Sequence, residues 1–126
     1  MTKKGFTLIE LLVVISIIGI LIGISLFGMQ GARESSRDAR RKSDLEMIRS
    51  GLEIYKSDCN VYVPAPLSWG GLLTGSCPTA NTYIATIPKD PLDPTYVYTY
   101  ARPTTTTYTL CATLEQTGLA YCVSNP

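Results

Sequence analysis

The sequence contains no histidine, and no proline occurs before Pro64. Histidine is the commonest general base, so its absence removes the most frequent catalytic proton carrier. A glycine-rich phosphate loop and a nucleophile elbow are missing as well. The four cysteines form no C-x-x-C pair, which disfavours a zinc site. We therefore predict that the protein is not an enzyme, and that it has no catalytic residues, no cofactor and no metal site.

Charge is missing from Leu11 to Met29, where only Ser16 and Ser25 are polar. About 20 apolar residues are enough to cross a bilayer as a helix. Lys3 and Lys4 precede this run, so the positive-inside rule predicts a cytoplasmic N-terminus and an extracytoplasmic remainder. A cleavable secretory signal would have a shorter apolar core and a small-residue cleavage site. The pattern predicts a single-pass membrane protein.

The stretch from Phe6 to about Ser57 lacks a strong helix breaker. It predicts one helix of about 50 residues, apolar all round in its first half and amphipathic in its second. The predicted buried face consists of Leu45, Ile48, Leu52 and Tyr55, widened by Met47, Gly51 and Ile54. The other sides are expected to carry the charged residues, which include Arg40, Arg41 and Asp44.

The remainder predicts a small sheet that covers the amphipathic half of the helix. Residues 60–83 have a loop-like composition and predict a mostly irregular connection. Alternation in 95–100, 108–114 and 119–123 predicts three antiparallel strands. The expected fold class is α+β: a long N-terminal helix packed on a C-terminal antiparallel sheet of about three strands. The expected parts are a leader (1–5), a transmembrane half (6–29), an amphipathic half (30–57) and a globular region (58–126).

The even number of cysteines, all after the apolar run, predicts disulfides in an exported module. If residues 115–118 form a four-residue turn, the strand register places Cys111 opposite Cys122. Directly opposed strand residues have Cα atoms about 4.5 to 5.5 Å apart, within disulfide range. Cys59 and Cys77 are then left to each other, and their bridge would close the loop after the helix.

Glu10 is the one acid at the start of the apolar segment. A carboxylate within a membrane helix is costly. It could reach back to the headgroups, or it could meet a cation. A cut after Gly5 would create such a cation, because the freed α-amine of Phe6 has a reference pKa of about 7.7 to 8.0.

The stretch "KKGFTLIELLVVISIIGIL" resembles the N-terminal signature of type IV pilins and pseudopilins. The resemblance implies cleavage between Gly5 and Phe6 by a prepilin peptidase, and N-methylation of the Phe6 amine. Glu10 takes the family's acidic position and is expected to pair with the Phe6 amine of a neighbouring subunit. A plain signal anchor would explain the apolar run but not this order of residues.

The resemblance implies a structural subunit of a type IV pilus-like filament or a type II secretion pseudopilus. The implied partners are other pilin-like subunits, prepilin peptidase, an inner-membrane assembly platform with its ATPase, and membrane lipid before assembly. The implied location is the bacterial inner membrane, then a periplasmic or surface filament. The alternative is a membrane-anchored monomeric extracytoplasmic binding protein. Nucleic acid is not expected, because the net charge is +1 and the basic cluster at 33–42 lies close to the membrane.

Two later stretches, "SDLEMIRSGLEIYKSDCNVYV" and "YIATIPKDPLDPTYVYTY", are similar to major pseudopilins of type II secretion. Those proteins bind calcium in a later acidic loop, whereas Glu115 is the one acid after Tyr100 here. The cysteines would then replace calcium in holding the loops, and the choice between secretion system and pilus stays open. Asp90 and Asp93 lie beside prolines and are expected to shape turns rather than bind metal.

Overall fold

The structure is a computed structural model that describes residues 5–126. Lys3 and Lys4 of the predicted leader lie outside the described residues. The chain divides into two compact units, Met1–Glu34 and Ser35–Pro126. The part boundaries that we predict after residues 5, 29 and 57 stay predictions.

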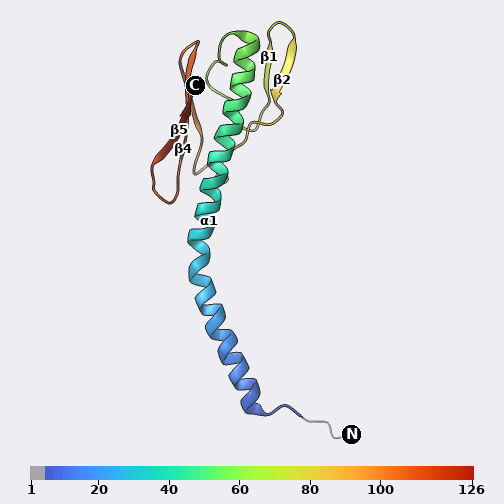
Figure 1. The fold of residues 1–126 in the computed structure, drawn as a ribbon, viewed down its shortest axis with the longest axis vertical. Helices are drawn as coiled ribbons and strands as arrows, with labels where there is room; N and C mark the ends of the chain where they lie inside the picture. The colour runs from blue at the N-terminus through green and yellow to red at the C-terminus, as the bar shows by residue number, and fades with distance from the viewer. Residues whose placement is uncertain (1–4) are drawn as a thin grey trace. The chain divides into compact units, whose positions relative to one another are not determined.

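A single helix, α1 (Leu8–Cys59), accounts for the N-terminal half of the sequence (Figure 1). It confirms the predicted long helix, with each end about two residues later than expected. At its C-terminal end, the backbone N–H of Asn60 donates to the carbonyl oxygen of Lys56 at 2.8 Å, and Asn60 has a φ of 60°. A residue in this left-handed conformation is a common way to end a helix.

In the unit that ends at Glu34, the apolar side chains of α1 are exposed: Phe6 is 88% exposed, Ile24 70% and Phe27 92%. By length and composition α1 can cross a membrane. An apolar surface that surrounds the whole helix needs lipid or other helices to cover it.

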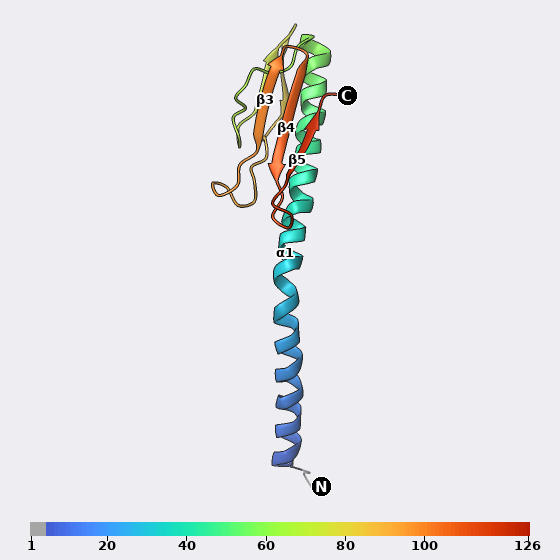
Figure 2. The same ribbon diagram turned by 90° about the vertical axis from the view of Figure 1, so that its left-hand side faces the viewer.

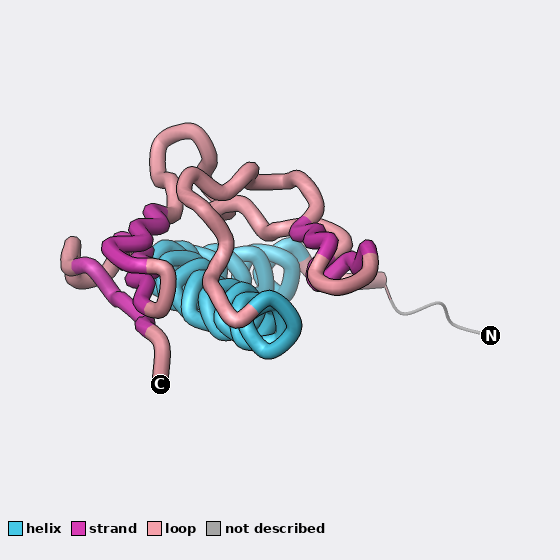
Figure 3. The backbone as a smooth tube through the Cα atoms, turned by 90° about the horizontal axis from the view of Figure 1, so that it is seen from above, coloured by secondary structure: helices cyan, strands magenta, loops and turns pink. Residues whose placement is uncertain are grey.

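The unit Ser35–Pro126 contains five strands in two antiparallel sheets (Figure 2). A hairpin pairs β1 (Leu73–Ser76) with β2 (Ala80–Ile84). The second sheet has the order β3 (Thr99–Thr104), β4 (Thr107–Thr113) and β5 (Ala120–Ser124). The hairpin and the three-stranded sheet lie on two sides of the C-terminal part of α1, and loops between them pass over it (Figure 3). The predicted α+β class with a small antiparallel sheet is confirmed.

Two strand predictions were wrong in detail. The hairpin β1–β2 forms inside the stretch that we expected to be irregular. The first strand of the larger sheet begins at Thr99 rather than at residue 95, because the N–H groups of Thr95 and Tyr96 donate to the carbonyl oxygen of Leu92 in a turn, at 2.8 and 3.3 Å. Pro103 lies within β3, where a proline is tolerated because β3 is an edge strand and the register shifts after Ala101.

The core confirms most of the predicted helix face and corrects part of it. Leu45, Ile48 and Leu52 are fully buried and share one cluster with residues of β4 and of the loops. The expected widening was wrong for two positions: Met47 is 51% exposed and Ile54 is 55% exposed. Neither side chain belongs to the cluster of buried residues that α1 shares with the strands.

Gly51 is buried where the hairpin approaches the helix, and a Cβ atom there would collide with the Ile84 side chain. The disulfides link the same elements. The structure joins Cys59, at the end of α1, to Cys77 in the turn of the hairpin. It joins Cys111 of β4 to Cys122 of β5, which are directly opposed in the register. The pair Cys111–Cys122 is the one that the strand register predicts, and Cys59–Cys77 is the pair that this prediction leaves.

Candidate functional site

The N-terminal segment contains the residues that the sequence singles out for processing and assembly. Gly5, Phe6 and Thr7 precede the first turn of α1, and all three are exposed. The Gly5–Phe6 peptide therefore lies in non-helical chain, which is the form in which a peptide bond can enter a protease site. Glu10 lies on the first turn and is exposed too.

Glu10 also has a local role that our sequence reasoning missed. Its carboxylate accepts the backbone N–H of Thr7 at 2.8 Å and the Thr7 hydroxyl at 2.7 Å. In return the Glu10 N–H donates to the Thr7 hydroxyl oxygen at 3.3 Å. This reciprocal arrangement is a capping box, and its signal, Thr-x-x-Glu before an apolar run, is present in the sequence. The Glu10 carboxylate thus caps the N-terminus of α1 and is exposed there.

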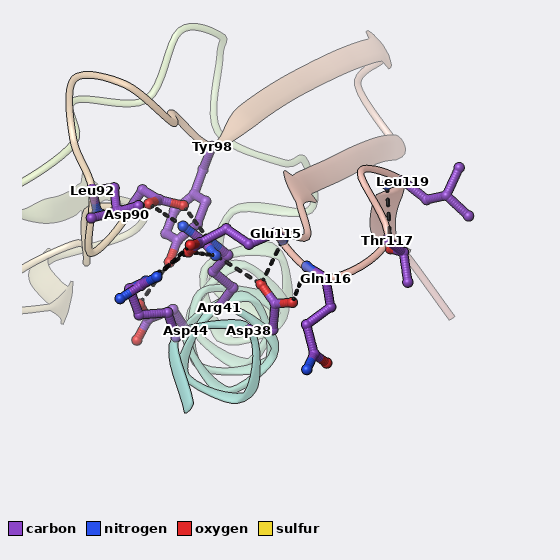
Figure 4. A network of polar contacts seen from close by, with 11 residues as sticks. Asp38, Arg41, Asp44, Asp90, Leu92, Tyr98, Glu115, Gln116, Thr117 and Leu119 are labelled. Atoms are coloured by element: carbon purple, nitrogen blue, oxygen red, sulfur yellow. Dashed lines mark hydrogen bonds and ion pairs between the residues drawn. The ribbon is translucent and has the colours of Figure 1, made fainter. Parts of the chain in front are cut away.

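A second group of charged side chains lies in the unit Ser35–Pro126 (Figure 4). We call it the Arg41 cluster, and it consists of Arg37, Asp38, Arg41, Asp90 and Glu115. The Arg41 guanidinium is fully buried. Its Nε donates to Asp90 Oδ2 at 2.6 Å and its Nη2 to Asp90 Oδ1 at 2.8 Å. Its Nη1 donates to Asp38 at 2.7 Å and also to Glu115.

Hydrogen bonds of the Arg41 cluster connect two turns to α1, one between β4 and β5 and one before β3. Asp38 accepts the backbone N–H groups of Glu115 at 2.9 Å and of Gln116 at 3.1 Å, at the turn between β4 and β5. Arg37 donates to both carboxylate oxygens of Glu115 at 2.8 and 2.6 Å. Asp90 connects the turn before β3 to α1. Its carboxylate accepts the N–H of Leu92 within the turn and the guanidinium N–H of Arg41 on the helix.

Asp44 lies next to this cluster on α1 and accepts the hydroxyl of Tyr98 at 2.8 Å. The prediction that Arg41 and Asp44 lie on the solvent side of the helix was wrong. Arg41 and Asp44 extend the buried face of α1 by one turn. They can be buried because acidic residues and a tyrosine from later in the sequence form hydrogen bonds with them.

The electrostatics of the Arg41 cluster follow from these bonds. The hydrogen bonds from Arg37 and Arg41 lower the pKa of Glu115 to about 2, although burial opposes this shift. Burial acts to raise the pKa of Asp38, but the two backbone N–H donors and Arg41 outweigh it and the pKa is lowered. The hydrogen bond to Asp90 raises the pKa of Arg41. Asp38, Arg41 and Glu115 are therefore held in their ionised forms.

The lowered pKa of Glu115 predicts a loss of stability in acid. A carboxyl whose pKa is lower in the folded state stabilises the fold above its ordinary pKa of 4.5, and the contribution is lost as the pH falls toward 2. We expect the thermal midpoint of the wild type to fall over this interval, and the midpoint of Glu115→Gln to be lower at pH 7 and to change less. Parallel pH curves for the two proteins, measured by circular dichroism, would contradict this assignment.

The residues of this region do not fit a calcium ion of the kind that the similar proteins bind. Calcium prefers six to eight oxygen ligands. Both Glu115 oxygens bond arginine, and both Asp90 oxygens bond Arg41. Within residues 5–126 no group of three or more acidic or cysteine side chains is arranged to hold a metal ion.

Comparison with known proteins adds to this picture. Residues 1–26 match the prokaryotic N-terminal methylation motif. The chain is 33% identical over 98 residues to the type II secretion system core protein G of Pectobacterium carotovorum subsp. carotovorum, covering 71% of this chain and 62% of that protein. It is 31% identical over 104 residues to core protein G of Vibrio cholerae serotype O1, covering 76% of this chain and 70% of that protein.

A third relative, core protein G of Aeromonas hydrophila, is 32% identical over 98 residues, covering 71% of this chain and 67% of the relative. The chain thus spans about 62% to 70% of the length of these relatives. No solved structure gives a significant match. With the methylation motif at its start and identity of 31% or more across these relatives, the chain belongs to the type II secretion system core protein G family, the major pseudopilins.

Proposed function

We propose that this chain is a structural subunit of a type II secretion pseudopilus. The observation that carries the proposal is the exposed apolar part of α1, which begins directly after the Gly5-Phe6 motif. A helix that is apolar on every side is stable in lipid, and it is equally well covered by identical helices in a polymer. The same segment can therefore anchor a single subunit and later join subunits in a filament.

Processing is the first step of the proposal. Prepilin peptidase cleaves between Gly5 and Phe6 on the cytoplasmic side, and the new Phe6 amine is methylated. The exposed, non-helical peptide before α1 supports this step. The subunit then stays in the inner membrane through α1, with the unit Ser35–Pro126 in the periplasm, until the assembly platform and its ATPase add it to the polymer.

Pairing between Glu10 and the Phe6 amine of a neighbour is the second step. A charge buried among apolar helices is costly when unpaired and much less so when paired. The pair therefore penalises misaligned helices and acts as a register device. Glu10 bonds only its own Thr7 among residues 5–126, so its carboxylate can turn to a neighbour's amine when that cap is exchanged.

N-terminal sequencing and intact mass of the membrane-extracted protein test the proposal. We expect the mature chain to begin at methylated Phe6 in cells that contain prepilin peptidase, and to retain Met1 in cells that lack it. Gly5→Val should block cleavage, whereas Gly19→Val, a matched change within α1, should leave it complete. An uncleaved wild-type chain in peptidase-containing cells would support the monomeric anchor instead and overturn the proposal.

A further inference from the structure

A line of seven exposed residues runs along α1 within the unit Ser35–Pro126. They follow one another at alternating steps of four and three residues, so they share one side of the helix. Within this unit, the sheets and the loops leave one side of the helix uncovered (Figure 3). We call the set the α1 seam, and it consists of Ser36, Arg40, Ser43, Met47, Ser50, Ile54 and Ser57.

The spacing of the α1 seam is that of a contact between two helices. Steps of four and three average 3.5 residues, which is the repeat at which the side chains of two packed helices interdigitate. Serine alternates with larger side chains along the seam, and small residues let two helices approach closely. Met47 and Ile54 are apolar, yet they are 51% and 55% exposed. A second helix would cover both.

The polar groups of the α1 seam suit an apolar partner. Ser50 and Ser57 each donate their hydroxyl to a carbonyl oxygen of the preceding turn, at 2.9 Å. Ser16 and Ser25 do the same in the apolar first half of α1, at 2.7 and 2.9 Å. A hydroxyl that bonds its own helix can be buried without leaving a hydrogen bond unmade. The seam positions from 43 to 57 also carry no charge.

The apolar part of α1, residues 8–29, has the length and the charge that match the seam. Both stretches contain 22 residues (8–29 and 36–57), or about 33 Å of helix at 1.5 Å per residue. Each contains one charged residue, and the signs are opposite: Glu10 in the apolar part and Arg40 in the seam. Arg40 is exposed and forms no ion pair within residues 5–126. The apolar part of a second copy is therefore complementary to the seam.

The match also predicts how the two copies are offset. If parallel helices align residue 8 of one copy with residue 36 of the other, the offset is 28 residues, or about 42 Å. Arg40 then lies two residues, about 3 Å along the axis, from the Glu10 of the other copy. A carboxylate has two acceptor oxygens, so Glu10 can accept from Arg40 and from an N-terminal amine together.

The α1 seam is too small to hold two copies together by itself. A stable complex buries roughly 800 Å² on each partner, whereas Met47 and Ile54 are the two large apolar side chains that the seam offers. The contact is therefore expected in the polymer, where other contacts already hold the subunits, and not between two subunits in detergent.

We propose that the α1 seam binds the apolar part of α1 of another subunit, offset by about 42 Å, with Arg40 beside the Glu10 of that subunit. The inference rests on the proposed function, because it requires a polymer of parallel subunits. It adds the partner of the second half of α1, and it explains why an exposed side of this helix is apolar.

Photo-crosslinking of pelleted filaments tests the contact. In a Met29→Leu background, Met47 is the one methionine that remains once Met1 is removed with the leader. Photo-methionine, a diazirine analogue, then labels the seam without added bulk. After trypsin digestion, we expect peptide 43–49 to be joined to peptide 6–33 in filaments, and not in subunits dissolved in detergent. A control chain with Met29→Leu, Met47→Leu and Leu72→Met moves the probe to another exposed apolar position, and should not give this product.

A Met47 probe that joins two copies of peptide 43–49, or that reaches only other peptides or lipid, would overturn the inference. The same digest tests the proposed function separately, because an unprocessed chain gives a peptide that begins at Gly5 instead of Phe6. Processed filaments with a misplaced crosslink would thus contradict the seam contact alone.

A charge in the seam gives a second readout. Met47→Glu would place a carboxylate against the apolar helix of another subunit, so we expect at least about tenfold less pelleted filament. Leu72→Glu is the matched control and should assemble like the wild type, because Leu72 is 62% exposed and outside the seam. Thermal unfolding in detergent checks that both variants fold. Normal assembly of a folded Met47→Glu chain would overturn the inference.

Discussion

Replacing Arg41 with glutamine is expected to lower the free energy of unfolding of the unit Ser35–Pro126 by about 3 to 5 kcal/mol. The substitution leaves the buried Asp38 and Asp90 and the partly buried Glu115 without the cation that they share. It also removes the hydrogen bonds that connect Asp90, in the turn before β3, to α1. Urea unfolding of the full chain in detergent measures the effect, with the fluorescence of Trp69 as the signal, because Trp69 packs against the buried Tyr98.

Two further variants test whether the loss of stability comes from the buried position of Arg41 or from the removal of any positive charge on α1. Arg49→Gln removes a cation of the same helix from a surface pair with Glu46 at 3.5 Å, and its cost is expected to be at most about 1 kcal/mol. Arg41→Lys keeps the charge but loses the bidentate contact with Asp90. Its free energy of unfolding should therefore lie between those of the wild type and Arg41→Gln. If Arg41→Gln were as stable as Arg49→Gln, the Arg41 cluster would not hold the unit together.

Replacing Glu10 with glutamine is expected to reduce filament assembly by at least about tenfold while the start of α1 is preserved. Glutamine can replace glutamate in a capping box, so the contacts with Thr7 can be kept. The charge that would meet the Phe6 amine of a neighbour is lost. Glu10→Ala removes both the charge and the cap. Pelleted filaments from cells measure assembly, and circular dichroism in detergent measures the helix.

The comparison of these two variants decides between the roles of Glu10. The register role requires that both fail to assemble. Normal assembly of Glu10→Gln combined with failure of Glu10→Ala would assign Glu10 to capping alone. The neighbouring substitution Thr7→Ala is a matched control, because it weakens the same cap and leaves the carboxylate in place.

The helix and the last two strands could be predicted because their signals are local. The apolar run, the lack of breakers and the alternation in 108–114 and 119–123 are each contained in a short stretch. The opposed cysteines followed from a four-residue turn, which the structure contains between Leu114 and Leu119. The capping box of Thr7 and Glu10 is a local pattern too, and it is as readable from the sequence as the apolar run that follows it.

The hairpin β1–β2 and the Arg41 cluster depend on contacts between distant residues. The hairpin is held by the bridge from Cys77 to Cys59 and by the packing of Ile84 over Gly51, while its own residues have the composition of a loop. Arg41 is buried because Asp90 and Glu115, 49 and 74 residues later, surround it. No helical periodicity distinguishes such an arginine from an exposed one.

The central claim is that the α1 segments of neighbouring subunits meet through Glu10 and a processed N-terminus. A high-resolution map of the assembled filament tests it most directly. We predict the Glu10 carboxylate within ion-pair distance, about 4 Å, of the Phe6 amine of an adjacent subunit. A map in which Glu10 bonds only its own Thr7, far from every amine, would contradict the account.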